Sequence, residues 1–420
     1  MPQAPDAADL PALCPVVGIG ASAGGLEALS ELLSELPANT GMAFVLVQHL
    51  DPVRPSMLAE ILGKKTAMPV AEARNDMALA PDHLYVIPPN ATLTVSGPVL
   101  RVTARHGRIP APIDWLFRSL AAERSDAAVG VLLSGASSDG TRGAQEIKAA
   151  GGIVLAQEPD SAAFPIMPQS AISAGATDAV LRPADIARRL AMLGGRIGAG
   201  AGEAWRAAGA PEAHDVEATW RRIFRLLRGT SGIEFTHYKR TTLERRIARR
   251  QAVRHVDELA AYARLLEEDP AELHTLAQDV LITVTSFFRD PESFEALTQT
   301  VFPTLLERRA PDAPLRIWVP GCASGEEVYS IAICLMEHLG ERAERMPIQF
   351  FGTDVSEPAI AQAREARYPE GIEAEVSAER LRRHFAKLDH HYRIAKSIRD
   401  LCVFARHDVP GTPRFRTSIS

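Results

Sequence analysis

The stretch VVGIGASAGG, residues 16–25, decides how the first part of this 420-residue chain folds. Its uncharged, apolar first half predicts a buried strand, and the helical pattern LEALSELLSELP follows directly. A serine, Ser22, stands at the turn between the two. A serine at such a turn projects from the carboxyl edge of a sheet, next to the free N–H groups that begin the helix. The stretch therefore predicts both a central strand and a reactive hydroxyl.

Similar apolar runs recur on the carboxyl side of this stretch, and helical patterns separate them. The runs are MAFVLVQ, AAVGVLL and GGIVLAQ, and one intervening helical pattern is RGAQEIKAAG. Alternation of this kind is typical of βαβ units. We therefore expect residues 14–193 to form a doubly wound α/β domain on a parallel sheet.

The remaining chain divides by composition. Residues 1–13 are rich in Pro, Ala and Asp and predict a disordered leader, whereas the Gly/Ala-rich residues 194–213 predict a linker. Residues 216–295 show helical patterns only, which predicts a small all-α domain. Strand and helix patterns alternate again in residues 296–420, which predicts a second α/β domain.

The overall composition excludes several classes of protein. Apolar residues make up 46% and charged residues 23%, which is typical of globular chains. No apolar run approaches the length of about 18 residues that a membrane helix needs, so we expect no membrane insertion. The first residues lack the charged and apolar regions of a secretory signal. The four cysteines are too scattered for a disulfide framework or a zinc cluster. We therefore expect a cytoplasmic protein without a metal site.

Two further polar residues follow strands of the first predicted sheet. His49 comes directly after MAFVLVQ, and Asp139 lies in the loop SGASSDG after AAVGVLL. Because the carboxyl ends of parallel strands meet at one edge, Ser22, His49 and Asp139 are expected there together. Nucleophile, base and acid are the three roles of a catalytic triad.

Spacing alone leaves two other interpretations of the glycines open. Gly18, Gly20 and Ala23 also match the G-x-G-x-x-G/A dinucleotide fingerprint, which requires an acidic residue at the tip of the second strand. That tip carries Gln48 and His49 here. The third interpretation is a glycine-rich turn that only allows close packing between helix and strand.

A second loop with binding chemistry lies near the carboxyl end. The strand LRIWVP, residues 315–320, runs into Gly-Cys-Ala-Ser-Gly-Glu-Glu, and Asp354 ends the next strand. Glycines let a ligand approach the backbone, and a carboxylate at this place suits ribose hydroxyls. Any nucleotide-type ligand satisfies this pattern.

Three ordered motifs, GASAGG, VQH and SGASSDG, resemble the catalytic domain of the CheB-type chemotaxis receptor methylesterases over residues 14–193. The resemblance implies that Ser22 is the nucleophile, His49 the general base and Asp139 the residue that orients it. It also implies hydrolysis of glutamate γ-methyl esters on chemoreceptor cytoplasmic helices, with release of methanol and without a cofactor. A receptor-docking scaffold without activity is the competing interpretation.

The segment TVTSFFRD, residues 283–290, together with the second glycine loop resembles the CheR-type receptor glutamate methyltransferases. This resemblance runs from about Trp220 to residue 420 and implies a Rossmann-like fold that binds S-adenosylmethionine. By motif match, the residues that contact S-adenosylmethionine are Thr285, Arg289, Glu327 and Asp354. Thr283 and Asp408 stand where the family commonly has Asn.

Basic residues are concentrated in the predicted all-α domain. Residues 221–254 hold eleven Lys or Arg against two Glu, although the whole chain has a formal net charge of −6. By resemblance, this region docks acidic receptor helices. Phosphate neutralisation and a solvated helix face are the alternatives. Because no zinc motif, RNA-binding signature or aromatic stacking pattern accompanies the cluster, we expect no nucleic-acid partner.

The methyltransferase part is expected to be incomplete. After DLCVFARHD the family continues with further strands, whereas this sequence continues as PGTPRFRTSIS. The sequence holds three predicted strands here, LRIWV, IQFFG and LCVFA. They form the strand before the glycine loop and its neighbours on one side of the sheet, whereas the strands on its other side are missing. We therefore expect truncation, weak binding of S-adenosylmethionine and no methyl transfer.

Overall fold

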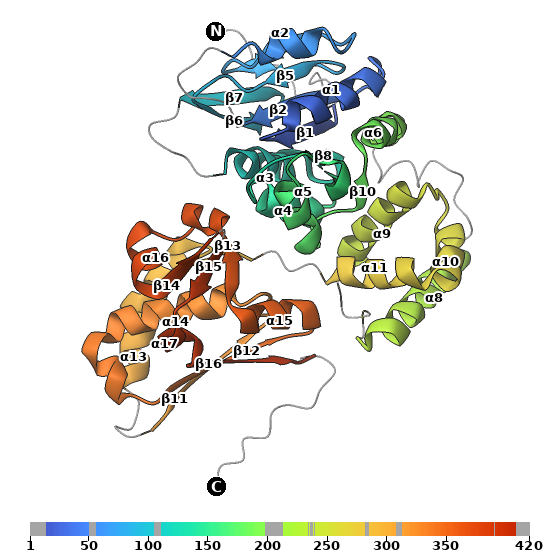
Figure 1. The fold of residues 1–420 in the computed structure, drawn as a ribbon. Helices are drawn as coiled ribbons and strands as arrows, with labels where there is room; N and C mark the ends of the chain where they lie inside the picture. The colour runs from blue at the N-terminus through green and yellow to red at the C-terminus, as the bar shows by residue number, and fades with distance from the viewer. Residues whose placement is uncertain are drawn as a thin grey trace, which may run out of the picture. The chain divides into compact units, whose positions relative to one another are not determined.

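The chain forms two compact units in the computed structural model, one of residues 1–211 with 247–258 and one of residues 212–246 with 259–420 (Figure 1). The predicted leader and most of the predicted linker lie outside the residues that the structure describes. The described residues are 14–49, 56–104, 111–197, 213–233, 235, 238, 240–281, 285–307, 313–389 and 391–408.

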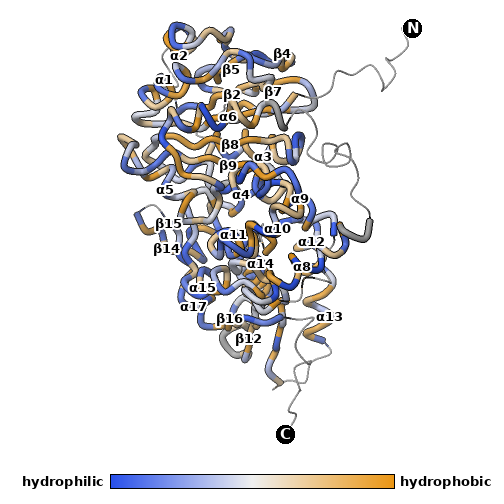
Figure 2. The backbone as a smooth tube through the Cα atoms, turned by 90° about the vertical axis from the view of Figure 1, so that its right-hand side faces the viewer, coloured by the Kyte–Doolittle hydropathy of each residue, from blue (hydrophilic) through white to orange (hydrophobic). Residues whose placement is uncertain are grey.

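The first unit is built on a parallel sheet of seven strands in the order β10-β9-β8-β1-β2-β5-β3 (Figure 1). Every residue of β1 is buried, as a central parallel strand requires, and the neighbouring β8 is mostly hydrophobic in Figure 2. The doubly wound parallel sheet is thus confirmed. The strands are β1 (Val16–Ala21), β2 (Ala43–Gln48), β3 (Val70–Glu72), β5 (Leu84–Val86), β8 (Ala128–Leu132), β9 (Ile153–Gln157) and β10 (Ala179–Leu181).

Helices cover both faces of this sheet, and each face has its own apolar core. One core joins alternate residues of β1 and β2 to α1 (Gly25–Glu35), α2 (Leu58–Gly63) and α6 (Pro183–Ile197). The other joins the opposite faces of the strands to α3 (Pro112–Arg124), α4 (Thr141–Ala150) and α5 (Ile166–Ser173). Helix α6 extends to Ile197, four residues into the range predicted as linker. Two 3₁₀ turns, η1 (Ser125–Ala127) and η2 (Pro159–Ser161), and residues 247–254 of α9 (Arg240–Arg254) also belong to this unit.

Two glycines of β1 allow α3 to lie close to the sheet. A Cβ on Gly18 would come within 2.5 Å of Leu120, and one on Gly20 within 2.5 Å of Ile113. Both contacts are shorter than atoms can tolerate, so a side chain at either position would force Leu120 or Ile113 of α3 to move. The glycines that match the dinucleotide fingerprint are therefore required by packing.

A small antiparallel sheet, which the sequence patterns did not predict, joins the first unit beside α3. It has the order β4-β7-β6, with β4 (Met77–Ala78), β6 (Ala91–Ser96) and β7 (Val99–Ala104). The hydroxyl of Ser119 on α3 accepts a hydrogen bond from the backbone N–H of Val95 on β6.

The predicted all-α region, residues 216–295, contains helices and no strand among its described residues. The helices are α8 (Ala213–Ser231), α9 (Arg240–Arg254), α10 (Leu259–Glu268), α11 (Pro270–Val280) and α12 (Pro291–Ala296). A π-helical turn, Leu297–Val301, and α13 (Phe302–Glu307) follow.

The second unit contains a parallel sheet in the order β11-β12-β16 and an antiparallel sheet in the order β13-β15-β14. The strands are β11 (Leu315–Pro320), β12 (Ile348–Asp354), β13 (Arg367–Pro369), β14 (Phe385–Leu388), β15 (His391–Ile394) and β16 (Cys402–Arg406). The helices beside them are α14 (Glu326–Leu339), α15 (Glu357–Glu365), α16 (Ala378–His384) and α17 (Lys396–Arg399), with 3₁₀ turns at Gly340–Arg345 and Glu370–Ala374. Within the described residues, β11 pairs with β12 alone.

Among the described residues, no helix is long and apolar enough to span a bilayer.

Candidate active site

Ser22, His49 and Asp139 come together at the carboxyl edge of the first sheet. Ser22 and His49 directly follow β1 and β2, Asp139 lies in the loop after β8, and these three strands are neighbours. The Ser22 Oγ lies 3.1 Å from His49 Nδ1, and His49 Nε2 lies 2.8 Å from Asp139 Oδ2. The three side chains thus form a continuous hydrogen-bonded chain, with Nε2 as the donor to the carboxylate in the neutral tautomer that this chain requires.

The Asp139 carboxylate is held by the first turn of α3. Its Oδ2 accepts the backbone N–H of Ile113, and its Oδ1 accepts that of Asp114, both at 3.0 Å. N–H groups in the first turn of a helix have no carbonyl partner within the helix, so they can donate to Asp139, and the helix dipole also favours a negative charge there. The residue is only 6% exposed. Asp139 is therefore fixed in position independently of His49.

A second buried carboxyl group lies beside this one. Asp114 Oδ1 accepts the backbone N–H of Gly143 at 2.7 Å. Burial and the nearby charge of Asp139 raise the pKa of Asp114 from 3.8 to about 7, although Arg118 and Arg142 oppose the shift. Asp114 consequently changes charge near neutral pH beside the Ser–His–Asp chain.

Ser134 connects the turn that carries Ser22 to the loop after β8. Its carbonyl accepts the Ser22 N–H at 2.9 Å, and its hydroxyl donates to the Ala23 carbonyl at 2.8 Å. The Ser22 N–H is therefore occupied and is not available to a ligand. In the described part of the chain, the N–H groups of Ala23 and Ala136 have no hydrogen-bond partner.

The expected cofactor residues in the second unit lie on three segments. Asp354, which ends β12, is buried and accepts the N–H groups of Ala323 and Ser356 at 3.0 and 2.8 Å. Glu327 is exposed in the first turn of α14. Each carboxylate oxygen of Asp354 keeps a further acceptor site, so the loop and this residue fit a ligand with a ribose diol.

Thr285 and Arg289 lie on a segment that docks onto α14. The Phe288 N–H donates to Ser330 Oγ at 3.0 Å, which fixes the segment one turn beyond Glu327. Phe288 and Asp290 adopt left-handed backbone with φ of 51° and 56°. Such backbone is unfavourable for a bulky residue such as Phe288 and persists only where the surroundings enforce it. Thr283, which stands where the CheR-type methyltransferases commonly have Asn, lies outside the described residues.

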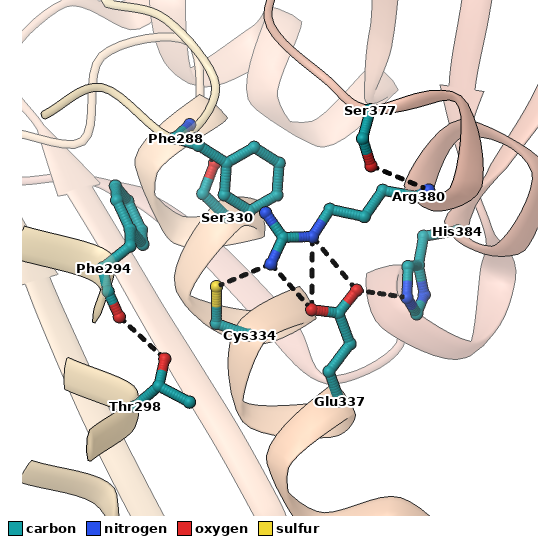
Figure 3. Close-up of polar contacts among 9 residues, drawn as sticks. All are labelled: Phe288, Phe294, Thr298, Ser330, Cys334, Glu337, Ser377, Arg380 and His384. Carbon is teal, nitrogen blue, oxygen red and sulfur yellow. Dashed lines mark hydrogen bonds and ion pairs between the residues drawn. The ribbon is translucent and has the colours of Figure 1, made fainter. Parts of the chain in front are cut away.

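A cluster of charged residues holds this strained segment from the other side (Figure 3). Arg380 on α16 donates to both oxygens of Glu337, at distances down to 2.8 Å, and its guanidinium lies 4.1 Å from the Phe288 ring centroid. His384 Nε2 lies 3.3 Å from the same carboxylate. The cluster therefore links α14, α16 and the segment that carries Arg289.

Comparison with protein families matches the first unit to the CheB methylesterase model over residues 17–190. A putative protein-glutamate methylesterase/protein-glutamine glutaminase of Leptospira interrogans is 34% identical, and the match covers 42% of this chain and 92% of the relative. The chain belongs to the CheB methylesterase family. Beyond the CheB domain, the models for the CheR methyltransferase all-alpha domain and SAM-binding domain match residues 218–281 and 283–418. The two predicted family resemblances are thus confirmed.

Two other proteins resemble this CheB–CheR chain. An uncharacterized 104.1 kDa protein of Rhodobacter capsulatus is 38% identical over 85% of the chain and 39% of the relative. The crystal structure of the Thermotoga maritima CheB methylesterase catalytic domain is 29% identical, covers 43% of this chain and 98% of that one, and gives a TM-score of 0.40. The chain spans 39–53% of the length of several curated relatives.

Sequence patterns did not single out Asp114, Ser134 or Phe164, which all contact the candidate site. Pro112 at the first helical position, with an acidic residue two positions later, is a helix-start signal that could have marked Asp114. Ser134 opens the loop SGASSDG, but its contacts cross the sheet and leave no spacing signal. Phe164 lies in an irregular segment without periodicity.

Replacing Asp114 by Asn is expected to remove a pH-dependent loss of stability. Because the folded CheB unit holds this proton up to a pH of about 7 and an unfolded Asp releases it near 3.8, folding takes up a proton between these values. The free energy of unfolding therefore falls as the pH rises through this window, by up to about 4 kcal/mol. In D114N, which can still accept the Gly143 N–H, this fall should be absent.

Urea unfolding from pH 4 to 8 measures the difference. Exposed Asp160→Asn is the control and should follow the wild type. Identical pH dependence of D114N and wild type would contradict the raised pKa.

Replacing Arg380 by Met is expected to lower the free energy of unfolding of the second unit by about 1–2 kcal/mol. The cause is that Glu337, only 26% exposed, loses its two-point ion pair. In a double-mutant cycle, E337Q should recover part of this loss. The exposed Lys396–Asp400 pair on α17 provides the control, since K396M should cost less than about 0.5 kcal/mol. Equal losses for R380M and K396M would show that the cluster carries no special stability.

Proposed function

We propose that the CheB domain hydrolyses glutamate γ-methyl esters on chemoreceptor cytoplasmic helices and releases methanol. The observation that carries this proposal is the hydrogen-bonded chain from Ser22 through His49 to Asp139 at one edge of the sheet. Membership of the CheB methylesterase family supports the choice of ester.

In the proposed reaction, Ser22 Oγ attacks the ester carbonyl while His49 Nδ1 accepts the hydroxyl proton. Asp139 stabilises the imidazolium that forms, because its carboxylate accepts Nε2–H. The unpartnered N–H groups of Ala23 and Ala136 are the proposed donors to the oxyanion. His49 then gives its proton to the leaving methoxide, which departs as methanol. Water attacks the acyl-enzyme in the same way and frees the glutamate carboxylate and Ser22.

The same residues suit a second leaving group. The Leptospira relative is named as a protein-glutamine glutaminase as well as a methylesterase. Attack of Ser22 on a glutamine side-chain amide would require His49 to protonate the departing ammonia. We include amide hydrolysis in the proposal on the strength of that name.

S22A is expected to lower methanol release from methyl-esterified receptor fragments at least about a thousandfold, because it removes the nucleophile. The assay is gas chromatography of methanol at saturating substrate. S34A, which changes an exposed serine of α1, is the matched control and should retain full activity. Absence of methanol release by the wild-type protein would instead favour the receptor-docking scaffold. An S22A variant as active as wild type would overturn the triad.

We further propose that the CheR region binds S-adenosylmethionine through Thr285, Arg289, Glu327 and Asp354. When bound, this cofactor supplies an electrophilic methyl group. Asp354 would accept the ribose hydroxyls, and the exposed charges of Glu327 and Arg289 would orient the ligand. The acidic-helix docking surface is proposed to be formed by the exposed basic residues of 221–254, such as Arg221, Arg225 and Arg245. The basic residues Arg246, Arg249 and Arg250 of the same range are buried and do not contribute to it. The expected truncation, weak binding of S-adenosylmethionine and loss of methyl transfer stay predictions.

Calorimetric titration with S-adenosylmethionine tests this site. D354N is expected to weaken binding about tenfold or more, since a charged acceptor of a ribose hydroxyl is lost. E357Q, an exposed neighbour on α15, should leave the affinity unchanged. Equal affinity of D354N and wild type would exclude Asp354 as a ligand-binding residue.

A further inference from the structure

Phe164 is an exposed aromatic residue beside the turn that carries Ser22. Its side chain is 44% exposed, whereas the aromatic residues of the sheet core, such as Phe44 and Phe117, are fully buried. The ring lies against Gly24, where an added Cβ would come within 3.1 Å of Phe164 Cδ2. Gly24 caps α1 and is only two residues from Ser22. The ring therefore forms part of the surface next to the nucleophile.

The backbone of Phe164 is fixed to the same loop that fixes the nucleophile. Its N–H donates to Ser134 Oγ at 2.9 Å, and its carbonyl accepts the Gly135 N–H at 2.9 Å. Ser134 in turn bonds to Ser22 and Ala23. The ring and the nucleophile thus share one rigid support.

Core packing explains Met167 in this segment but not the Phe164 ring. Met167 is fully buried, donates its N–H to the Gly135 carbonyl and fills the space over Gly135, where a Cβ would lie within 2.4 Å of Met167 Cε. Met167 thus fixes the segment to the core of the first unit. Phe164 leaves apolar surface in water beside the turn that carries Ser22, and covering it would be favourable.

We propose that Phe164 is a specificity-determining residue of the CheB domain. Its ring contacts an apolar side chain of the substrate helix, one turn from the esterified glutamate. The inference rests on the proposed function, because the occupant is the amphipathic helix that carries the ester. The neutral ring favours an apolar neighbour over a polar one, since only the former gains by leaving water together with it.

Two synthetic helical peptides with one glutamyl methyl ester each test this proposal. One carries leucine one helical turn on either side of the ester, and the other carries serine there. Wild-type protein should hydrolyse the leucine peptide with about tenfold higher kcat/KM. F164A should bring this ratio to about one, through KM rather than kcat. F164L, which keeps an apolar side chain, should retain most of the preference.

Hydrolysis of p-nitrophenyl acetate reports on the triad alone and should be equal in wild type, F164A and F164L. M192A, which removes an exposed apolar residue of α6, is the control and should leave the peptide ratio unchanged. A ratio near one in the wild type would overturn the proposal and leave the esterase function intact. A parallel loss of p-nitrophenyl acetate hydrolysis in F164A would show that the ring only supports the nucleophile turn. Failure of wild type to release methanol from either peptide would refute the proposed function, and the role of Phe164 with it.

Discussion

The two hydrogen bonds from the first turn of α3 to the Asp139 carboxylate are the interaction on which the candidate active site depends. They place a negative charge at a helix N-terminus, where it is stabilised, and leave one carboxylate oxygen in reach of His49. Since β1, β2 and β8 are adjacent and parallel, their carboxyl ends then bring Ser22 and His49 to the same point. The order of the strands thus determines where the three side chains come together, and α3 fixes the position of Asp139.

Both units use a strand, a glycine-containing turn and a helix to present a reactive or binding group. In the CheB domain the turn presents the Ser22 hydroxyl, and the Ser134 carbonyl accepts the Ser22 N–H. In the CheR domain the turn Gly321–Gly325 precedes α14, and Asp354 from the next strand accepts a backbone N–H of that turn. The first arrangement favours attack on a carbonyl, whereas the second leaves a carboxylate for a sugar. The same local geometry thus presents a hydroxyl in one unit and a carboxylate in the other.

The sequence predicted those features that depend on local pattern. Apolar runs located β1, β2, β8 and β9. Ser22 and His49 directly follow two of these strands and Asp139 lies in the loop after a third, so the pattern predicted that the three would lie close together, as they do. The sequence patterns did not predict Asp114, Ser134 or Phe164. These residues contact segments that are distant in sequence, and such contacts produce no periodic pattern. The small strands β4 and β13 escaped because two or three residues are too few to show alternation. The helix end at Ile197 was missed because Gly194 and Gly195 weaken the helical pattern without breaking it.

The close approach of α3 to Gly18 and Gly20 makes one helix responsible for two tasks. Its buried side chains fill the space over β1, and its first N–H groups hold the triad acid. A methyl group added to Gly18 or Gly20 would force Leu120 or Ile113 of α3 to move, and the Ile113 N–H is one of the two donors to Asp139. In a selection for esterase activity, substitutions at these two buried glycines would therefore be selected against, although neither position belongs to the Ser–His–Asp chain.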